Sequence, residues 1–167
     1  MSSQRVMFGG RADPSILPKG PNGRSLCRWC NLEVQRGRQT FCSDWCVEEW
    51  RLRSDPSYLR ERVLARDLGI CAACGVDCLE AWRHLRRLRG TARLRAARDW
   101  QLGKRKSLWD ADHITPVAEG GGECDLSNMR TLCLKCHRVR TAELRRRLQA
   151  RRLSAAPRAD HHGEEGR

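Results

Sequence analysis

The spacing of the cysteines constrains this chain more than any other feature. Eight of the ten cysteines stand in four short pairs, three spaced C-x-x-C and one spaced C-x-x-x-C. In a reducing compartment such pairs bind metal more readily than they form disulfides, although disulfides and packed free thiols are the alternatives. Tetrahedral Zn²⁺ requires four soft donors, and two closely spaced pairs supply them with little loop strain. The sequence therefore predicts two structural zinc sites.

Each half of the chain contributes one of these sites. The predicted ligands are Cys27, Cys30, Cys42 and Cys46 in the first half, and Cys71, Cys74, Cys133 and Cys136 in the second. In each half a C-x-x-C knuckle comes first and the second pair opens a helix, an arrangement typical of a treble clef. We expect Cys78 and Cys124 to be free thiols packed as small apolar groups, with Cys78 as an alternative ligand in place of Cys74.

The composition excludes a large buried core and indicates an anionic partner. The 167 residues are 40% hydrophobic but 32% charged, enough for one ordinary domain or two very small ones. The formal net charge of +13 favours binding to a polyanion, and 29 of the 33 basic residues are arginine. Because arginine so outnumbers lysine, we expect a bacterial or phage source with a high-GC genome.

Membrane and secretory signals are missing from the sequence. No apolar run approaches the roughly 20 residues of a membrane span, and Met1–Gly10 lacks the apolar region of a signal peptide. We therefore expect a soluble, cytoplasmic protein.

Shifts in composition divide the chain into five segments. Both ends are small and polar or rich in Gly and Pro, so we expect them to be disordered. The segments are 1–24, a disordered N-terminal stretch; 25–53, a treble-clef zinc finger; 54–70, a linking helix; 71–153, a second zinc unit with an Arg-rich helical insertion at 79–107; and 154–167, a disordered tail.

Two basic stretches flank an acidic one. Residues 79–107 carry a net charge of +8 and residues 138–153 one of +6, whereas residues 108–137 sum to −3. Both basic stretches have the composition of helices. Like charges at positions i and i+4 repel unless an anion offsets them, so these Arg-rich helices are expected to contact a polyanion.

The stretch from Trp109 to Thr141 holds the residues that suit catalysis. The alternation of apolar and polar residues predicts a strand ending at Asp112-His113, and a second short strand is expected at 130–134. His137 directly follows the last zinc ligand, early in a helix. A hairpin followed by a helix would bring Asp112, His113 and His137 to one cleft.

These residue types match the requirements of phosphodiester hydrolysis. Asp112 and His137 are suitable ligands for a divalent cation such as Mg²⁺ or Mn²⁺, and they leave positions open for phosphate oxygens and water. His113 is the candidate general base, because an imidazole exchanges protons near neutral pH. Neighbours on a strand point to opposite faces, so both can enter the cleft only if the strand ends or twists there. Asp110, two residues before this group, and Asp125, in the loop, are not assigned as ligands.

The same segment resembles the HNH endonuclease family of the ββα-metal fold. The motifs that carry the resemblance are Asp112-His113-Ile114, Pro116-Val117, Gly120 to Gly122, Leu126 to Asn128, and Leu132-Cys133 to Cys136-His137. The resemblance implies that His113 activates water, that Asp112 and His137 hold the catalytic ion, and that Asn128 orients the loop carrying His113. It also implies that 71–153 is a nuclease domain that cuts or nicks DNA.

The N-terminal finger extends the resemblance. Its Phe41-Cys42-Ser43 motif is similar to a finger that precedes the HNH segment in vertebrate annealing helicases with a RAN-binding zinc finger. The present sequence contains no P-loop and no room for a helicase motor, so fork remodelling is not expected of it.

These observations predict an α+β chain of two small zinc-stabilised treble-clef units, the second a DNA nuclease. The substrate would be duplex or branched DNA, and structure selectivity is left open. The alternative is a non-enzymatic zinc module or adaptor that binds nucleic acid. In either case the N-terminal finger could contact a protein partner.

Overall fold

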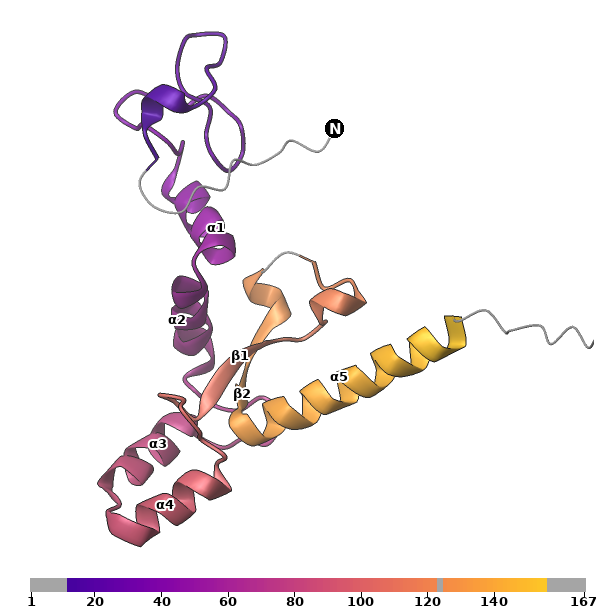
Figure 1. Ribbon diagram of the computed structural model, residues 1–167. Helices are drawn as coiled ribbons and strands as arrows, with labels where there is room; N and C mark the ends of the chain where they lie inside the picture. The colour runs from indigo at the N-terminus through magenta and orange to yellow at the C-terminus, as the bar shows by residue number, and fades with distance from the viewer. Residues whose placement is uncertain (1–11, 123–124, 156–167) are drawn as a thin grey trace, which may run out of the picture.

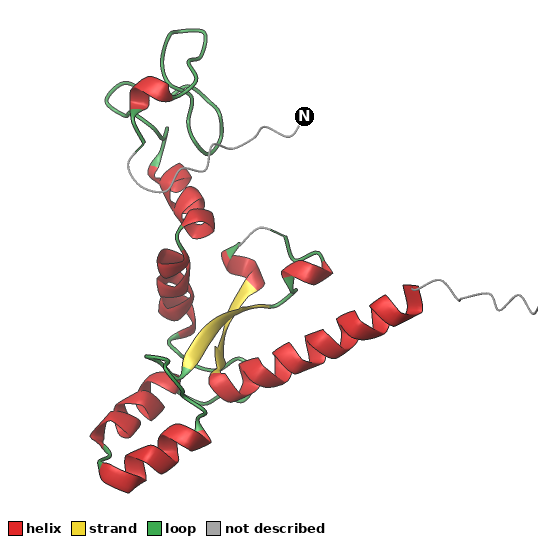
Figure 2. Cartoon of the chain, viewed as in Figure 1, coloured by secondary structure: helices red, strands yellow, loops and turns green. Residues whose placement is uncertain are grey.

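The computed structural model describes residues 12–122 and 125–155. In this part of the chain the elements are the short 3-10 helices η1 (Pro14–Ile16), η2 (Val117–Glu119) and η3 (Leu126–Asn128), the helices α1 (Asp44–Ser54), α2 (Pro56–Asp67), α3 (Cys78–Arg87), α4 (Gly90–Asp99) and α5 (Leu134–Ala155), and the strands β1 (Trp109–His113) and β2 (Met129–Cys133). The predicted α+β class is confirmed. The N-terminal finger and α1 lie at one end of the molecule, α3 and α4 lie at the other, and α5 projects away from the body (Figures 1 and 2).

The first cysteine-rich unit is a knuckle followed by α1. Its small core consists of Cys27, Val34 and Cys46, each at most 2% exposed. The helix begins as the Ser-Asp pair predicts, because the hydroxyl of Ser43 accepts a hydrogen bond from the backbone N–H of Cys46 at 3.1 Å. This cap places Cys46 in the first turn, on the side of the other three thiols.

Residues 12–24 differ from the disorder expected of them. Leu17 is only 5% exposed, and Lys19 pairs with Ser25 in an antiparallel bridge. The Pro and Gly residues of this segment form a turn at 20–24, which is closed by a hydrogen bond from the N–H of Gly20 to the carbonyl of Arg24. The cysteine knuckle supplies backbone partners for this segment, which composition alone does not reveal. Residues 1–11 lie outside the described part.

The second unit is built on an antiparallel hairpin. Trp109 pairs with Cys133 at one end and His113 with Met129 at the other. The strand β2 thus begins and ends one residue earlier than the expected 130–134. Its core is formed by buried apolar side chains of the strands and of the elements that pack against them. These residues include Cys71, Cys78, Leu85, Leu108, Trp109, Leu132, Cys133 and Leu134. The basic insertion predicted at 79–107 forms α3 and α4, anchored on this core by Leu85.

The helix α2, expected as a linker, packs against the hairpin. Leu59 and Val63 are buried with Met129 of β2 and with Leu52 from the end of α1. Figure 1 shows α2 running beside the two strands. The helix therefore packs on the hairpin as well as joining the two halves.

Polar side chains of α2 also satisfy the outer edge of β2. The carboxylate of Asp67 accepts a hydrogen bond from the N–H of Thr131 at 2.8 Å, and Arg66 donates to the carbonyl of Met129 at 2.6 Å. An edge strand otherwise presents unpaired backbone groups. Among the described residues, no helix is long and apolar enough to cross a membrane.

Candidate active site and zinc centres

Two groups of four thiols lie where the sequence predicted zinc sites. Within each group the sulfur atoms all lie within 4.8 Å of one another. The groups are Cys27, Cys30, Cys42 and Cys46, and Cys71, Cys74, Cys133 and Cys136. Four convergent thiols are the donor set that structural zinc prefers, so both tetrads can bind this ion.

The first cysteine of each tetrad already favours the thiolate form. Burial raises the pKa of the Cys27 and Cys71 thiols, but several backbone N–H donors outweigh it and lower both values to about 7. Two of these donors are the N–H groups of Cys42, 3.4 Å from Sγ of Cys27, and of Cys133, 3.2 Å from Sγ of Cys71. A backbone N–H of the second cysteine pair thus stabilises a thiolate of the first pair in each site.

Of the two remaining cysteines, Cys78 is fully buried at the start of α3 and is not part of the second tetrad. Burial raises the pKa of its thiol to about 12, as expected for a thiol packed as an apolar group. The position agrees with a packed free thiol and does not favour Cys78 as a substitute for Cys74. Cys124 lies outside the described residues.

The three predicted catalytic residues line one groove of about 290 Å³ between the end of β1, the following loop and the first turns of α5. The residues around it are Asp112, His113, Pro116, Val117, Ala118, His137, Arg140, Thr141, Leu144 and Arg147. Because β1 ends at His113, neighbours in sequence can border the same groove.

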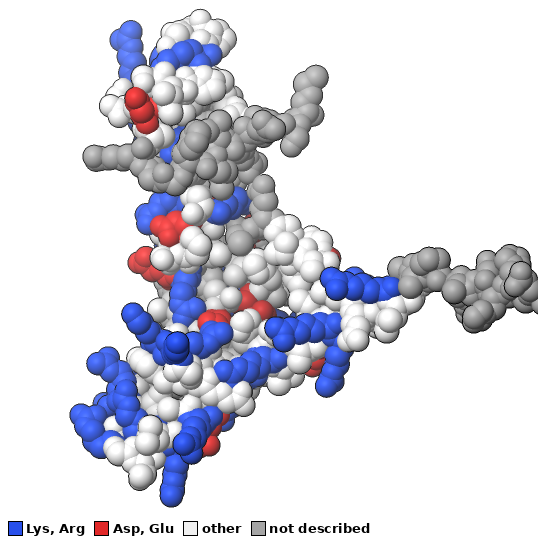
Figure 3. All heavy atoms as spheres, viewed as in Figure 1, with Lys and Arg blue, Asp and Glu red and all other residues white. Residues whose placement is uncertain are grey.

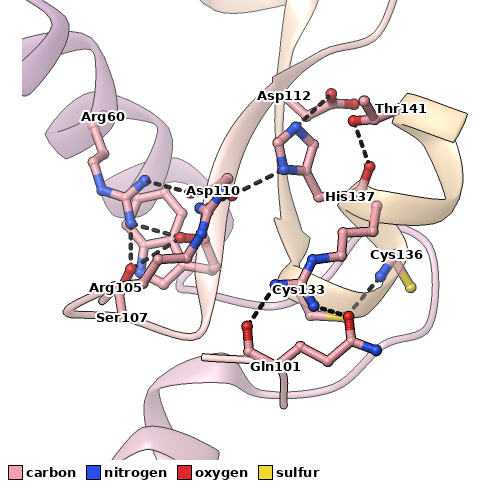
Figure 4. A network of polar contacts seen from close by, with 12 residues as sticks. Arg60, Gln101, Arg105, Ser107, Asp110, Asp112, Cys133, Cys136, His137 and Thr141 are labelled. Carbon is pink, nitrogen blue, oxygen red and sulfur yellow. Dashed lines mark hydrogen bonds and ion pairs between the residues drawn. The ribbon is translucent and has the colours of Figure 1, made fainter. Parts of the chain in front are cut away.

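The side chains of Asp112 and His137 lie close together in the lining of the groove. Nε2 of His137 lies 3.7 Å from Oδ1 of Asp112 (Figure 4). The other carboxylate oxygen of Asp112 accepts hydrogen bonds from Arg130 at 3.0 and 3.1 Å. One carboxylate oxygen and one imidazole nitrogen thus approach a common point. This donor pair fits a hard or borderline divalent cation.

Asp110 stands behind His137, and sequence reasoning did not identify this role. Its Oδ2 lies 2.9 Å from Nδ1 of His137 and also pairs with Arg105, while Arg60 lies 3.7 Å from Oδ1 (Figure 4). Burial raises the pKa of Asp110, but the hydrogen bond with His137 and the charge of Arg105 outweigh it and lower the pKa. The same hydrogen bond raises the pKa of His137. The alternation of β1 contained the signal, because Asp110 and Asp112 share one face of the strand.

Asn128 ties together the loop that follows His113. Its side chain accepts a hydrogen bond from the N–H of Thr115 at 2.8 Å and donates to the carbonyls of Thr115 and Gly121 at 3.0 and 2.9 Å. A Cβ at Gly121 would lie 1.8 Å from the carbonyl oxygen of Thr115, so the loop closes only with glycine there. These contacts are those that an orienting role for Asn128 would require.

An ion pair closes the far side of the groove. Glu119 of η2 binds Arg147 of α5 through two contacts of 2.9 Å. This pair holds the loop after His113 against α5. The sequence separation of the two residues hides the contact from pattern analysis.

The fold and the groove together define a class of protein. A hairpin and a following helix, pinned by a four-cysteine site, carry an aspartate and two histidines to one groove. This is the ββα-metal arrangement that the motifs predicted.

Comparison with known proteins identifies the family. Residues 100–143 match the family described as HNH endonuclease. The chain is also 34% identical to a protein whose structure is described as the crystal structure of the human ZRANB3 HNH domain, covering 97% of that chain and 59% of this one, with a TM-score of 0.47. On its sequence, the chain belongs to the HNH endonuclease family.

Curated relatives extend the similarity to the N-terminal finger. The chain is 39% identical over 158 residues to the mouse protein named DNA annealing helicase and endonuclease ZRANB3, and 35% identical to the human one, with 80% of this chain covered in each case. The cattle protein of the same name is 34% identical over 86% of the chain. The chain spans about 15% of the length of these relatives.

These relatives correct one expectation. The predicted bacterial or phage source, with its cytoplasmic location, is contradicted because the matched proteins come from mouse, cattle and human. Arginine pairs with phosphate through two parallel hydrogen bonds, so a protein that contacts phosphate has its own reason to prefer arginine over lysine. The ratio of the two residues therefore carried no reliable information on source.

Proposed function

We propose that this chain is a metal-dependent endonuclease that hydrolyses phosphodiester bonds in DNA. The observation that carries the proposal is the shared groove of Asp112, His113 and His137, with Asp110 hydrogen-bonded behind His137. The family and the word endonuclease in the relatives' names support the same reaction. The proposal includes a preference for branched DNA over other DNA structures.

In this mechanism the chain's own residues bind, orient and move protons. Asp112 and His137 would hold a divalent ion such as Mg²⁺ or Mn²⁺, which when bound supplies charge stabilisation for the phosphate. His113 takes the proton from the attacking water at an imidazole nitrogen. Asn128 holds the backbone of the loop so that His113 remains at the groove.

Nicking of a supercoiled plasmid tests the proposal. We expect cleavage with added Mg²⁺ or Mn²⁺, and we expect His113→Ala to slow it by about 10²- to 10⁴-fold because a general base is lost. Affinity for the same DNA, measured by fluorescence anisotropy, should stay nearly unchanged. Gln35→Ala, at an exposed polar residue of the finger, is the control and should cleave normally.

Two results would contradict the proposal. Normal cleavage by His113→Ala would remove the general-base assignment. Failure of the unaltered protein to cut duplex, single-stranded or branched DNA with any of these ions would favour the alternative, a zinc module or adaptor that binds nucleic acid without cutting it.

A further inference from the structure

Seven exposed arginines stand on the α3–α4 hairpin with no acidic residue between them. Residues 83–98, named here the arginine arm, contain no Asp or Glu. Its arginines are Arg83, Arg86, Arg87, Arg89, Arg93, Arg95 and Arg98, all exposed. Figure 3 shows basic side chains gathered at this end of the molecule.

The charges of the arm are not offset within the described part of the chain. No carboxylate of a described residue lies within the 4.0 Å of an ion pair from any of the seven. Several arginines of other elements do form ion pairs with carboxylates, for example Arg53 with Glu49 at 2.7 Å and Arg147 with Glu119 at 2.9 Å. The arm therefore leaves its cations available to an external anion.

This arrangement costs the helices free energy. Arg83 and Arg87 are four residues apart on α3, and Arg95 and Arg98 are three apart on α4, spacings at which like charges repel by a few tenths of a kcal/mol per pair. An external polyanion removes this repulsion and gains the attraction of the whole row.

The arm is anchored on the core through Leu85 but lies away from the groove. Leu85 of α3 is 2% exposed and packs in the same cluster as Trp109, the first residue of β1. Asp112 and His113 stand at the opposite end of that strand. At about 3.3 Å per residue, the four steps from Trp109 to His113 separate the two ends by roughly 13 Å. A ligand of the arm is therefore bound outside the residues that line the groove.

We propose that the arginine arm is a second DNA-binding surface, which holds the phosphate backbone of duplex DNA outside the cleavage groove. The choice of DNA as the polyanion rests on the proposed function. Arginine binds phosphate through bidentate hydrogen bonds, and such contacts add affinity and orientation without reading base sequence. The arm should therefore contribute strongly to salt-dependent affinity and little to base preference.

The test compares two triple variants with the same change in net charge. Arg86→Gln/Arg93→Gln/Arg95→Gln alters the arm, and Arg24→Gln/Arg36→Gln/Arg62→Gln alters three exposed arginines of the finger and α2. Binding to a labelled duplex of two helical turns is measured by anisotropy at several KCl concentrations, without added divalent ion. We expect the arm variant to lose at least about tenfold in affinity at low salt and its salt slope to fall by about 2 to 3, since each phosphate contact contributes about 0.9. The control should lose less than about threefold.

Further variants and outcomes keep the inference falsifiable. Circular dichroism should show both triple variants folded, and replacing the same three arm residues by lysine should keep the salt slope, because lysine retains the charge. Equal losses in the arm and control variants would overturn the inference. An arm variant that keeps its affinity for duplex DNA but no longer binds phosphatidylserine vesicles would also overturn the inference, because the anion would then be a lipid surface. A protein that binds through the arm but never nicks DNA would leave the inference standing and refute the nuclease.

Discussion

The Asp110 carboxylate selects the nitrogen of His137 that faces the groove. Because the pKa of Asp110 is lowered, its carboxylate is ionised near neutral pH and can only accept, so Nδ1 of His137 donates over the 2.9 Å contact. Nε2 is then the nitrogen that lies 3.7 Å from Asp112. In the proposed site, Asp110 is a positioning residue for the imidazole ligand.

Replacing Asp110 by asparagine should weaken divalent-ion binding without unfolding the protein. We expect the affinity for Mn²⁺ to fall about 10- to 100-fold, because the imidazole loses its charged hydrogen-bond acceptor. Calorimetric titration of zinc-loaded protein measures the affinity, and ¹⁵N shifts of the His137 ring in metal-free solution report its tautomer. Glu143→Gln on α5 removes the same charge and serves as control. An equal loss in both variants would show a general charge effect.

At the scale of residues, short motifs predicted which side chains line the groove, but not which other side chains hold them in place. Asp112, His113 and His137 were expected around one groove because their motif spacing fits a hairpin and a helix. Asp110 was set aside because it stands outside the motif, and Glu119 was not considered because its partner Arg147 lies 28 residues away. Side chains that act through another residue are recognised only when the backbone brings them together.

At the scale of elements, α2 closes the outer edge of the hairpin. Asp67 binds the N–H of Thr131 and pairs with Arg66 at 2.7 Å, near the C-terminal end of the helix. Burial raises the pKa of Asp67, but the hydrogen bonds from Arg66 and Thr131 outweigh it and lower the pKa. The ionised carboxylate is therefore the form that stabilises the folded chain.

Asp67→Asn should lower the free energy of unfolding by about 1 to 3 kcal/mol at pH 7, because the ion pair with Arg66 is lost and the N–H of Thr131 is left with an uncharged acceptor. A group whose folded pKa is lowered contributes fully above its unfolded value, near 3.9, and loses that contribution as the pH falls through the folded value. The difference from the unaltered protein should therefore stay constant between pH 6 and 8. Urea unfolding at both limits measures it, with the exposed Asp99→Asn as control. A difference that changes over this range would assign the effect to another group.

The elements themselves were largely predictable, and their packing was not. Alternation and motif position placed β2 within one residue of its observed bounds. The Ser-Asp-Pro start and apolar spacing predicted a helix near 54–70, but Leu59 and Val63 do not reveal which surface covers them. We propose that the second folding unit begins with α2, ahead of the boundary expected at residue 71.

At the scale of the whole molecule, the two cysteine tetrads belong to separate cores. Cys27 and Cys46 are buried with Val34 in the finger, whereas Cys71 and Cys133 belong to the large cluster around the hairpin. The two groups of thiols are those that the cysteine spacing predicted. The relation of the arginine arm to the groove could not be predicted, because it depends on how α3 packs against the start of β1.

The two zinc sites should therefore differ in what their loss does to cleavage. Cys42→Ser and Cys133→Ser should each reduce the bound zinc from two ions to one, as measured by atomic absorption. A structural zinc site contributes about 10 to 16 kcal/mol of apparent binding free energy, more than a small unit can lose and stay folded. Cys133 joins β2 to the helix that carries His137, so Cys133→Ser should abolish plasmid nicking and the cooperative thermal transition of the second unit. Cys42→Ser should keep nicking within about threefold, since none of the groove residues comes from the finger. Loss of cleavage in Cys42→Ser, with the second transition intact, would mean that the finger itself holds the substrate.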